Sequence, residues 1–269
     1  MTAGQDTARP APRGRRVLPP QPASGDSQRR PLAVVTGATS GIGLAVAQDL
    51  AQDHDLVLLA RTASHLDGLA AALGEQSGAQ VRTCAVDLTD DTALADAIAS
   101  LDLSHVDVLV NSAGVEAAGR IEELTPQRWR SVLDLDLVAV AHLTSLLLPA
   151  LRLAHGLVIM VNSGAGQRTW PGQGLYCAAK HGLRALADAL REEERGALRV
   201  TTIYPGRVNT PMQKRLHKQG ATAGSGPGGA YRAKDHMRPQ SVAAAVRLAV
   251  SASRDACVED LTIRPTTVL

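Results

Sequence analysis

The chain has 269 residues, of which 45% are hydrophobic and 20% charged, and its formal net charge is +2 at pH 7. This composition provides enough apolar material for a core, and the length fits one α/β domain. Aromatic residues make up only 2% and Phe is absent, so the core must consist of aliphatic side chains. The small net charge, without a basic face bearing aromatics, argues against a nucleic-acid partner.

No metal site and no membrane partner are expected. The three cysteines, at positions 84, 177 and 257, lack metal-ligand spacing, and the eight histidines are scattered. A reduced, cytoplasmic protein is the simplest interpretation of this cysteine usage. The longest apolar run, 137–151, contains polar residues and a proline and does not reach the length of a membrane span.

Residues 1–30 are rich in Pro, Gly, Ser and Arg and show no hydrophobic period. They predict a disordered tail without the apolar segment of a secretory signal. The folded domain is expected over 31–269.

From residue 31 onward, short apolar runs alternate with helical patterns. We expect strands at 32–36, 56–60, 81–85, 106–110, 157–161, 199–204 and 258–263, and helices at 44–52, 64–73, 90–100, 126–153, 174–195 and 239–250. Thr125 and Pro126 are an N-cap and a first helical residue for the longest helix. Apolar strands in this alternation predict an α/β fold, a Rossmann-type doubly wound parallel sheet in a single domain.

The first strand is followed by the turn Thr36-Gly-Ala-Thr-Ser-Gly-Ile-Gly43, which opens the first helix. Glycines at such a junction let a phosphate approach the free N–H groups at the positive end of the helix. The turn therefore predicts a phosphate-binding cradle.

Three side chains indicate proton-transfer chemistry. Tyr176 and Lys180 are four residues apart, so on a helix they lie on one face. Ser163 follows an apolar strand, and a turn-rich segment could bring its hydroxyl beside the phenol. A serine nucleophile is disfavoured, because Val161 stands where a nucleophile elbow requires glycine.

Together these motifs resemble the short-chain dehydrogenases/reductases. The glycine turn, Asn111-Ser-Ala-Gly114, Ser163, the Tyr176–Lys180 pair and Pro205-Gly206 occur in the order and at the spacings of that family. The resemblance covers residues 31–264. It implies an oxidoreductase that interconverts a ketone or aldehyde and an alcohol by hydride transfer to or from a nicotinamide cofactor.

By the resemblance, Tyr176 is the general acid in reduction and the general base in oxidation. Ser163 would bond the substrate oxygen, and Lys180 would lower the pKa of Tyr176 and hold the nicotinamide ribose. The family commonly has an Asn on the long helix that supports a proton relay, whereas this chain has Asp136. An aspartate there predicts either a relay of altered pH dependence or reduced catalysis.

The second strand ends without the acidic residue that selects NAD, and Arg61 there presents a guanidinium suited to a 2′-phosphate. NADP(H) is therefore the expected cofactor, in preference to NAD(H). The resemblance places cofactor contacts at Gly37, Thr39, Ser40, Gly41, Ile42, Gly43, Arg61, Asp87, Leu88, Asn111, Ala113, Gly114, Tyr176, Lys180, Pro205, Gly206, Val208 and Thr210.

The segment 212–238 lies where this family carries a mobile substrate lid, but its residues do not name the substrate. The long helices at 126–153 and 174–195 fit the family's habit of forming homodimers and homotetramers. Two alternatives stay open: a non-catalytic dinucleotide-binding, redox-sensing module, and an interaction protein acting through the basic tail.

Overall fold

The computed structural model describes residues 29–218 and 231–266. The strands are β1 (Leu32–Thr36), β2 (Asp55–Ala60), β3 (Val81–Ala85), β4 (Val108–Asn111), β5 (Leu157–Val161), β6 (Arg199–Pro205) and β7 (Asp260–Ile263). The α-helices are α1 (Gly41–Leu50), α2 (Ala63–Ser77), α3 (Asp91–Ser100), α4 (Pro126–Leu133), α5 (Ala139–Ala154), α6 (Gly174–Glu193), α7 (Pro211–Lys218) and α8 (Pro239–Val250). The expected tail, except for its last two residues, and the middle of the expected lid lie outside the described residues.

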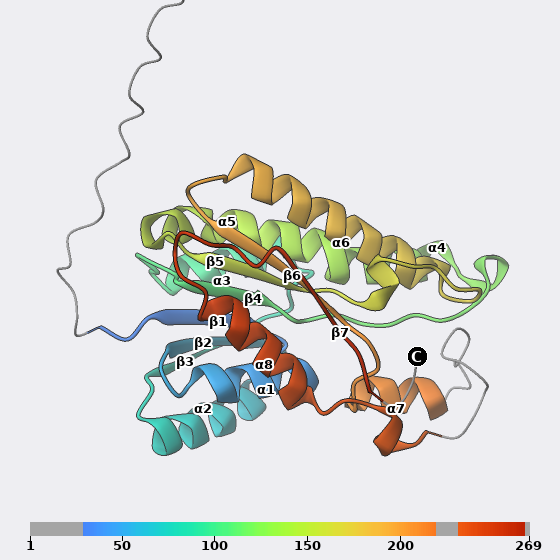
Figure 1. Ribbon diagram of the computed structural model, residues 1–269, viewed down its shortest axis with the longest axis horizontal. Helices are drawn as coiled ribbons and strands as arrows, with labels where there is room; N and C mark the ends of the chain where they lie inside the picture. The colour runs from blue at the N-terminus through green and yellow to red at the C-terminus, as the bar shows by residue number, and fades with distance from the viewer. Residues whose placement is uncertain (1–28, 219–230, 267–269) are drawn as a thin grey trace, which may run out of the picture.

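All seven strands pair in parallel, in the order β3-β2-β1-β4-β5-β6-β7. Helices α1, α2 and α8 cover one face of the sheet, and α3, α5 and α6 cover the other (Figure 1). The expectation of a doubly wound parallel sheet is confirmed. The order reverses at β1, which lies between β2 and β4, and such switch points are where ligands bind in open α/β sheets.

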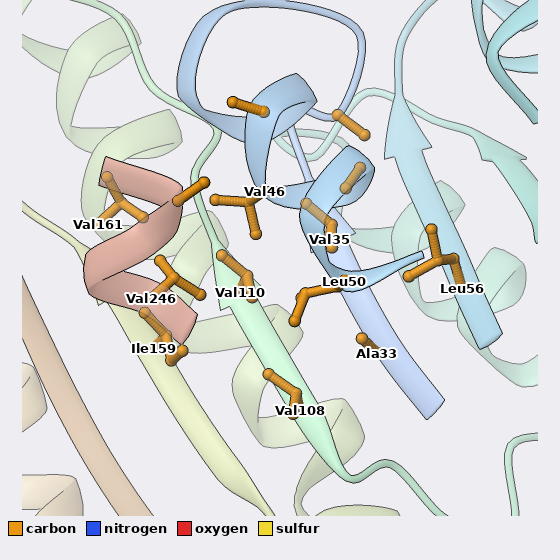
Figure 2. Packing of buried hydrophobic residues seen from close by; sticks show 14 of the residues in the cluster. Ala33, Val35, Val46, Leu50, Leu56, Val108, Val110, Ile159, Val161 and Val246 are labelled. Carbon is orange, nitrogen blue, oxygen red and sulfur yellow. The ribbon is translucent and has the colours of Figure 1, made fainter. Parts of the chain in front are cut away.

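The core is aliphatic, as the composition predicts. In β1, Ala33 and Val35 face the α1–α8 layer, whereas Val34 faces the opposite layer. This alternation follows from the two-residue period of a strand, and both faces are buried because helices cover both. Figure 2 shows Val46 of α1 and Val246 of α8 packed over the strands. Aliphatic side chains from alanine to leucine fill most of this layer, and it contains no Phe.

The predicted elements match the observed ones to within a few residues, and β4 shows why their ends differ. It begins two residues later than expected, because the N–H of Val106 bonds to the carbonyl of Ala150 rather than to a strand. The more consequential difference lies in the long helix. The expected single helix is interrupted between α4 and α5 by a π-helical segment, η2 (Asp134–Val138). A π turn inserts an extra residue and rotates the following side chains, and such segments are frequent at functional sites.

The combined helix from Pro126 to Ala154 is long and apolar enough to span a membrane by length and composition alone. One face of it packs in the core, where Leu143, Leu147 and Leu151 are buried between the sheet and its neighbouring helices, whereas Val138 and Leu153 are exposed. A buried helix of a globular domain meets the same criteria.

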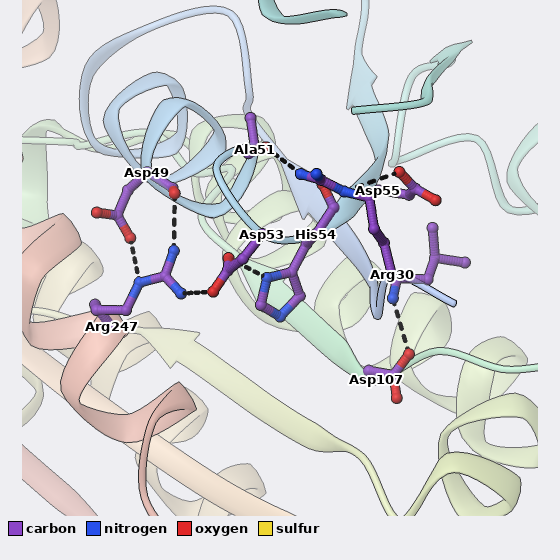
Figure 3. Close-up of polar contacts among 9 residues, drawn as sticks. Arg30, Asp49, Ala51, Asp53, His54, Asp55, Asp107 and Arg247 are labelled. Carbon is purple, nitrogen blue, oxygen red and sulfur yellow. Dashed lines mark hydrogen bonds and ion pairs between the residues drawn. The ribbon is translucent and has the colours of Figure 1, made fainter. Parts of the chain in front are cut away.

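At the amino-terminal edge of the sheet, an ion-pair network joins α8 to the end of α1 (Figure 3). The guanidinium of Arg247 donates to both the carboxylate and the carbonyl of Asp49, at 2.8 Å each, and to the carboxylate of Asp53 at 2.6 Å. Arg30 bonds the carbonyl of Ala51 at 2.6 Å, which fixes the entry into β1.

Replacing Arg247 by Met is expected to destabilise the protein by about 1–3 kcal/mol, because charge-assisted bonds between two packed helices are lost. Equilibrium urea unfolding measures the change, with the exposed Arg195→Met as the control, whose pair with Glu192 is about two-thirds exposed at both side chains. Equal midpoints for the two variants would contradict the structural role of the network.

Candidate active site

The site lies at the carboxyl edge of the sheet, around the switch point at β1. The hydroxyl of Thr36 accepts hydrogen bonds from the N–H groups of Ser112 and Ala113, at 2.9 and 3.0 Å. These bonds join the turn after β1 to the turn after β4. The glycine turn and the Asn111–Gly114 turn, which are distant in sequence, therefore form one continuous rim.

The glycine turn is shaped as a cradle that side chains would fill. Gly37 has φ +64°, and a Cβ there would lie 3.0 Å from the Cα of Ala113. A Cβ on Gly43 would lie 2.4 Å from the carbonyl oxygen of Gly37, a distance that real Cβ atoms do not reach. A Cβ on Gly41, whose φ is +57°, would lie 3.3 Å from a methyl carbon of Thr210. These short distances leave little room for a Cβ atom at any of the three positions. Glycine is therefore needed here to let backbone segments approach one another closely.

The N-terminus of α1 is open toward this cradle. Ser40 is in an extended conformation, and its side chain makes no cap hydrogen bond. The first N–H groups of a helix have no partner within the helix and carry its positive dipole end. The uncapped helix start and the glycine turn thus fit the pyrophosphate of a dinucleotide. Thr39 and Ile42 lie in the same turn, both partly buried.

The adenosine end of the predicted site lies beyond β2 and β3. Arg61 is exposed directly after β2, and its charge acts on Asp87 in the turn after β3. Hydrogen bonds from the N–H and hydroxyl of Thr89, at 3.0 and 2.8 Å, together with Arg61, hold the pKa of Asp87 below its ordinary value. Leu88 is buried beneath this turn. The end of β2 therefore carries a cation and no acid.

Asn111 differs from the other predicted cofactor contacts. It is buried, and its side-chain amide donates to the hydroxyl of Thr144 at 3.3 Å and to the sulfur of Met160 at 3.5 Å. Its side chain therefore ties β4 to α5 and β5 beneath the site. Only the backbone after it, at Ala113 and Gly114, faces the rim.

The loop after β6 closes the other side of the site. The N–H of Gly206 donates a hydrogen bond to the carbonyl of Ile263 in β7 at 2.7 Å. Val208 forms an isolated parallel β-bridge with Met237. Pro205 ends β6, and the hydroxyl of Thr210 accepts from the N–H of Gln213 at the start of α7. The loop is thus held in place against β7 and reaches the glycine turn through Thr210.

The predicted catalytic side chains converge as expected. Ser163 follows β5, and Tyr176 lies in the first turn of α6, where its phenol shares a hydrogen bond with the Ser163 hydroxyl. The ammonium of Lys180 lies 5.6 Å from the centre of the Tyr176 ring, one turn along α6. The spacing of four residues places both groups on the face that meets β5.

Asp136 is the fourth predicted member, and the structure buries it completely. Its Oδ1 accepts from the N–H of Val115 at 2.8 Å, and its Oδ2 lies 3.0 Å from the ammonium of Lys180. The π turn of η2 directs this carboxylate inward, against Gly114, where a Cβ would lie 3.0 Å from Oδ2. A relay based on Asn thus becomes a buried ion pair in this chain.

The acidity of Tyr176 differs from the sequence-based expectation. Burial first, and then the negative charges of Glu116 and Asp136, raise the pKa of Tyr176 well above its ordinary value, and the hydrogen bond to Ser163 opposes them. The ammonium of Lys180 lies 3.0 Å from the carboxylate of Asp136, whose charge opposes the effect of the ammonium on the phenol. At neutral pH the phenol is therefore protonated.

Sequence reasoning missed two residues of the site. The side-chain oxygen of Asn162 accepts from the N–H of Ser163 at 2.8 Å, and its amide donates to the carbonyl of Lys180 at 3.0 Å. Asn162 thus fixes the end of β5 and helix α6 to one another, and a buried polar residue directly before Ser163 was the available signal. The other is Glu116, two residues after Gly114, which carried no local signal in the sequence.

Burial raises the pKa of Glu116 to about 7, with Lys180 lowering it and Asp136 raising it. A raised pKa means that the folded state binds a proton more tightly than the unfolded state. The tighter binding of this proton contributes to the free energy of unfolding. That contribution is fully present below the ordinary glutamate pKa, and it is lost as the pH rises through about 7.

Glu116→Gln should therefore raise the melting temperature more at about pH 8 than at about pH 5, because the neutral amide avoids burying a charge. Differential scanning calorimetry at the two pH values measures this. The exposed Glu75→Gln on α2 is the control and should show no such pH dependence. A shift for Glu116→Gln that is the same at both pH values would contradict the burial of its charge.

The remaining sequence-based expectations concern metals and cysteines. Within residues 29–218 and 231–266, no cluster of metal-ligating side chains occurs. Cys177 is buried beside Tyr176, its thiol lies 3.6 Å from the carbonyl of Arg168, and burial raises its pKa. A thiol with a raised pKa is a poor nucleophile, so we interpret Cys177 as a packing residue of the core.

A parallel sheet with an open glycine cradle at its switch point defines a dinucleotide-binding protein. Comparison with known proteins identifies the family. The short chain dehydrogenase family matches residues 31–221, and the chain belongs to that family. It is an NAD(P)-dependent oxidoreductase.

Relatives of this chain span much of its length. An uncharacterized oxidoreductase of Staphylococcus epidermidis is 28% identical over 239 residues, covering 87% of this chain and 96% of the relative. Dehydrogenase/reductase SDR family member 7B of Bos taurus is 36% identical over 194 residues, which are 68% of this chain and 60% of that protein.

Solved structures agree in fold. An alcohol dehydrogenase of the archaeon Thermococcus sibiricus, complexed with 5-hydroxy-NADP, has a TM-score of 0.76 at 28% identity. The match covers 88% of this chain and 97% of the dehydrogenase chain. An actinorhodin polyketide ketoreductase with NADPH has a TM-score of 0.78 at 26% identity, with coverages of 87% and 96%.

Proposed function

We propose that this protein is an NADP(H)-dependent oxidoreductase that reduces a ketone or aldehyde to an alcohol, with Tyr176 as the general acid. One observation carries the proposal: Ser163, Tyr176 and Lys180 converge at the carboxyl edge of the sheet, beside the glycine cradle. The nicotinamide, when bound, supplies or accepts the hydride.

The residues of the chain supply the proton and the polar contacts. The phenol of Tyr176 donates its proton to the substrate oxygen as charge develops on it, and the hydroxyl of Ser163 donates a hydrogen bond to the same oxygen. Asp136 holds the ammonium of Lys180 in place below the phenol. Burial and nearby carboxylates raise the pKa of the phenol, so near neutral pH it is in the protonated form that can give a proton to the substrate oxygen during reduction.

NADP(H) is the preferred cofactor in this proposal. Arg61 directly follows β2, and the end of that strand lacks the acidic residue that would bond the adenosine ribose of NAD. The two nicotinamide-bound structures named above contain NADP-type cofactors, which supports the same choice. The first experiment is a thermal-shift titration of the purified protein with NADPH and NADH, followed by NADPH oxidation with a panel of carbonyl compounds. No shift with either cofactor would overturn the proposal.

Arg61→Ser is expected to weaken NADPH binding by about 10–100-fold, because a hydrogen-bonded ion pair with the 2′-phosphate is lost. Affinity for NADH should change little, since NADH has no phosphate there. Isothermal titration calorimetry with both cofactors measures the two affinities, and Arg82→Ser on β3, whose guanidinium bonds the carbonyl of Leu101, is the control. Equal losses for the two cofactors would argue against a 2′-phosphate contact.

A non-catalytic, redox-sensing role is the second candidate, and the ion pair of Asp136 with Lys180 is the observation that favours it. Binding of NADPH without turnover of any carbonyl would support it. We further propose a small-molecule substrate, a cytoplasmic protein and a homodimer or homotetramer, consistent with exposed apolar side chains at Val138 and Leu153 on the long helix. The proposed lid spans 212–238, of which α7 and residues 231–238 are described.

A further inference from the structure

Three rings pack together beside the loop after β6, in a part of the chain that the proposed mechanism does not use. His217 lies in α7, and Tyr231 and His236 lie in the segment that leads into α8. The ring centres of Tyr231 and His236 are 4.7 Å apart, and that of His217 lies 5.2 Å from Tyr231 and 5.6 Å from His236. Rings at such separations are in contact. These three residues, here called the ring cluster, therefore join α7 to the segment before α8.

The ring cluster is bonded to the loop after β6, residues 206–210. The phenol of Tyr231 donates a hydrogen bond to the side-chain oxygen of Asn209 at 2.5 Å. The backbone pairs there as well, because the N–H of Asn209 donates to the carbonyl of Met237 at 2.8 Å. The N–H of Met237 in turn donates to the carbonyl of Arg207 at 2.9 Å. One side-chain bond and two backbone bonds thus hold this segment against the loop.

The same loop borders the glycine cradle. Its last residue, Thr210, is so close to the glycine turn that a Cβ on Gly41 would lie 3.3 Å from a methyl carbon of Thr210. The start of the loop is held against β7. Between these ends, the side chain of Asn209 has Tyr231 as its only hydrogen-bond partner among the described residues. The hydroxyl of Tyr231 therefore fixes the middle of the loop.

The two histidines of the ring cluster have the same tautomer. Nδ1 of His217 lies 2.9 Å from the carbonyl oxygen of Gln213, and Nδ1 of His236 lies 2.8 Å from that of Arg232. Because a carbonyl oxygen can only accept, each Nδ1 carries a proton, and Nε2 of the neutral ring is an acceptor. His236 is only 9% exposed, and its Nε2 is buried without a hydrogen-bond partner in the described part of the chain. A proton on this Nε2 would create a buried cation with an unpaired donor.

The charges around His236 also oppose its protonation. Burial, and then His217 of α7 and Arg207 of the loop, lower the pKa of His236 below its ordinary value. The bond to the carbonyl of Arg232 and the charge of Asp235 act in the other direction, and the carboxylate of Asp235 is paired with the Arg232 guanidinium at 2.6 Å. A lowered pKa means that the neutral ring stabilises the folded state. This stabilisation is present above about pH 6.5 and is lost as the pH falls through the lowered pKa.

We propose that Tyr231 is a positioning residue for the nicotinamide ring, which acts through Asn209 by holding the loop 206–210 in place. The uncharged rings of His217 and His236 hold Tyr231 in turn, so the loop loosens when His236 takes up a proton. This inference rests on the proposed function, which places the nicotinamide against this loop. Binding of the nicotinamide part of the cofactor therefore depends on the Tyr231 hydroxyl and weakens in acid.

The test compares two ligands in calorimetric titrations. NADP⁺ carries the nicotinamide ring, whereas 2′-phospho-ADP-ribose has the same phosphates and riboses and lacks that ring. The quantity measured is the ratio of the Kd of NADP⁺ to the Kd of 2′-phospho-ADP-ribose near neutral pH, in the wild type, Tyr231→Phe and the control Tyr204→Phe. Each variant loses one phenolic hydroxyl and keeps its ring. Tyr204 lies on β6, and the charges that act on it belong to α6 and β7.

We expect the ratio to rise roughly 3–10-fold in Tyr231→Phe, because one hydrogen bond that positions the loop is lost. The ratio should be unchanged in Tyr204→Phe. In an Asn209→Ala background, Tyr231→Phe should have no further effect, since the acceptor is already absent. A merely structural loss would weaken the binding of both ligands alike. Equal ratios in the wild type and Tyr231→Phe would overturn the inference while leaving cofactor binding intact.

The same ratio, measured across pH, tests the role of His236. In the wild type it should rise roughly threefold or more as the pH falls from about 7.5 to about 5.5, because a protonated His236 loosens the ring cluster. His236→Phe keeps a ring that cannot take up a proton, so its rise should be smaller. Glu116, whose pKa is about 7, is present in both proteins and contributes equally. A rise of the same size in His236→Phe would refute the role of His236.

If neither ligand binds, the proposed function fails, and hydrogen exchange decides the inference. Amide exchange without any ligand, followed by mass spectrometry of peptides that contain 207–209 and 231–237, measures how firmly the loop is held. Faster exchange in Tyr231→Phe than in the wild type and Tyr204→Phe supports the positioning role. Unchanged exchange at Asn209 and Met237 in Tyr231→Phe refutes it.

Discussion

Tyr176→Phe is expected to lower kcat for carbonyl reduction by about 10²–10⁴-fold, because the variant has no phenolic proton to give to the substrate oxygen. The ring itself is retained, so the packing in the first turn of α6 should persist, as should cofactor binding. Steady-state NADPH oxidation measures the loss, and a thermal-shift titration with NADPH checks that the cofactor still binds.

Tyr204→Phe is the matched control for this variant. Tyr204 is buried on β6, and the charges that act on its phenol belong to α6 and β7, away from Ser163. It should retain activity. Unchanged activity in Tyr176→Phe would exclude this residue as the general acid and return the redox-sensing alternative to consideration.

Lys180→Met is expected to destabilise the protein by about 3–5 kcal/mol, because it leaves the carboxylate of Asp136 buried without its counter-charge. The carboxylate is fully buried and the lysine side chain is only 6% exposed, so water cannot replace the lost partner. For a chain of this size, such a loss corresponds to a fall of roughly 6–20 °C in the melting temperature. Calorimetry or urea unfolding measures it.

Two further variants separate the charge effect from the packing effect. The double variant Lys180→Met with Asp136→Asn buries no charge, and the Asn oxygen can still accept from the N–H of Val115. It should recover most of the stability while remaining inactive. Arg184→Met breaks an exposed ion pair with Asp188 on the same helix and should cost no more than about 0.5 kcal/mol. A single Lys180→Met variant as stable as Arg184→Met would contradict a buried ion pair.

Much of the fold could be predicted from the sequence because its signals are local. A run such as Leu32–Thr36 is apolar except for its last residue, which indicates a strand buried on both faces. Thr125 and Pro126 predict a helix start, and the Thr125 hydroxyl accepts from the N–H of Arg128 there. Alternation of such segments leaves few topologies besides a doubly wound parallel sheet.

Part of the candidate site could also be predicted from the sequence. The glycine turn lies at a strand–helix junction, where only residues without Cβ permit the close approach seen between Gly43 and Gly37. Tyr176 and Lys180 share a helix face by their spacing alone. These positions depend on backbone geometry within one or two turns of chain.

The sequence by itself thus predicted the seven strands, the helices other than α7, the cradle and the candidate residues for proton transfer. The tertiary structure decided what those residues can do. The π turn directs Asp136 toward Lys180, the side chain of Asn111 turns into the core, and burial raises the pKa values of Tyr176 and Glu116. Charge, burial and pKa depend on groups far apart in sequence, and only the packed sheet and helices fix the distances between them.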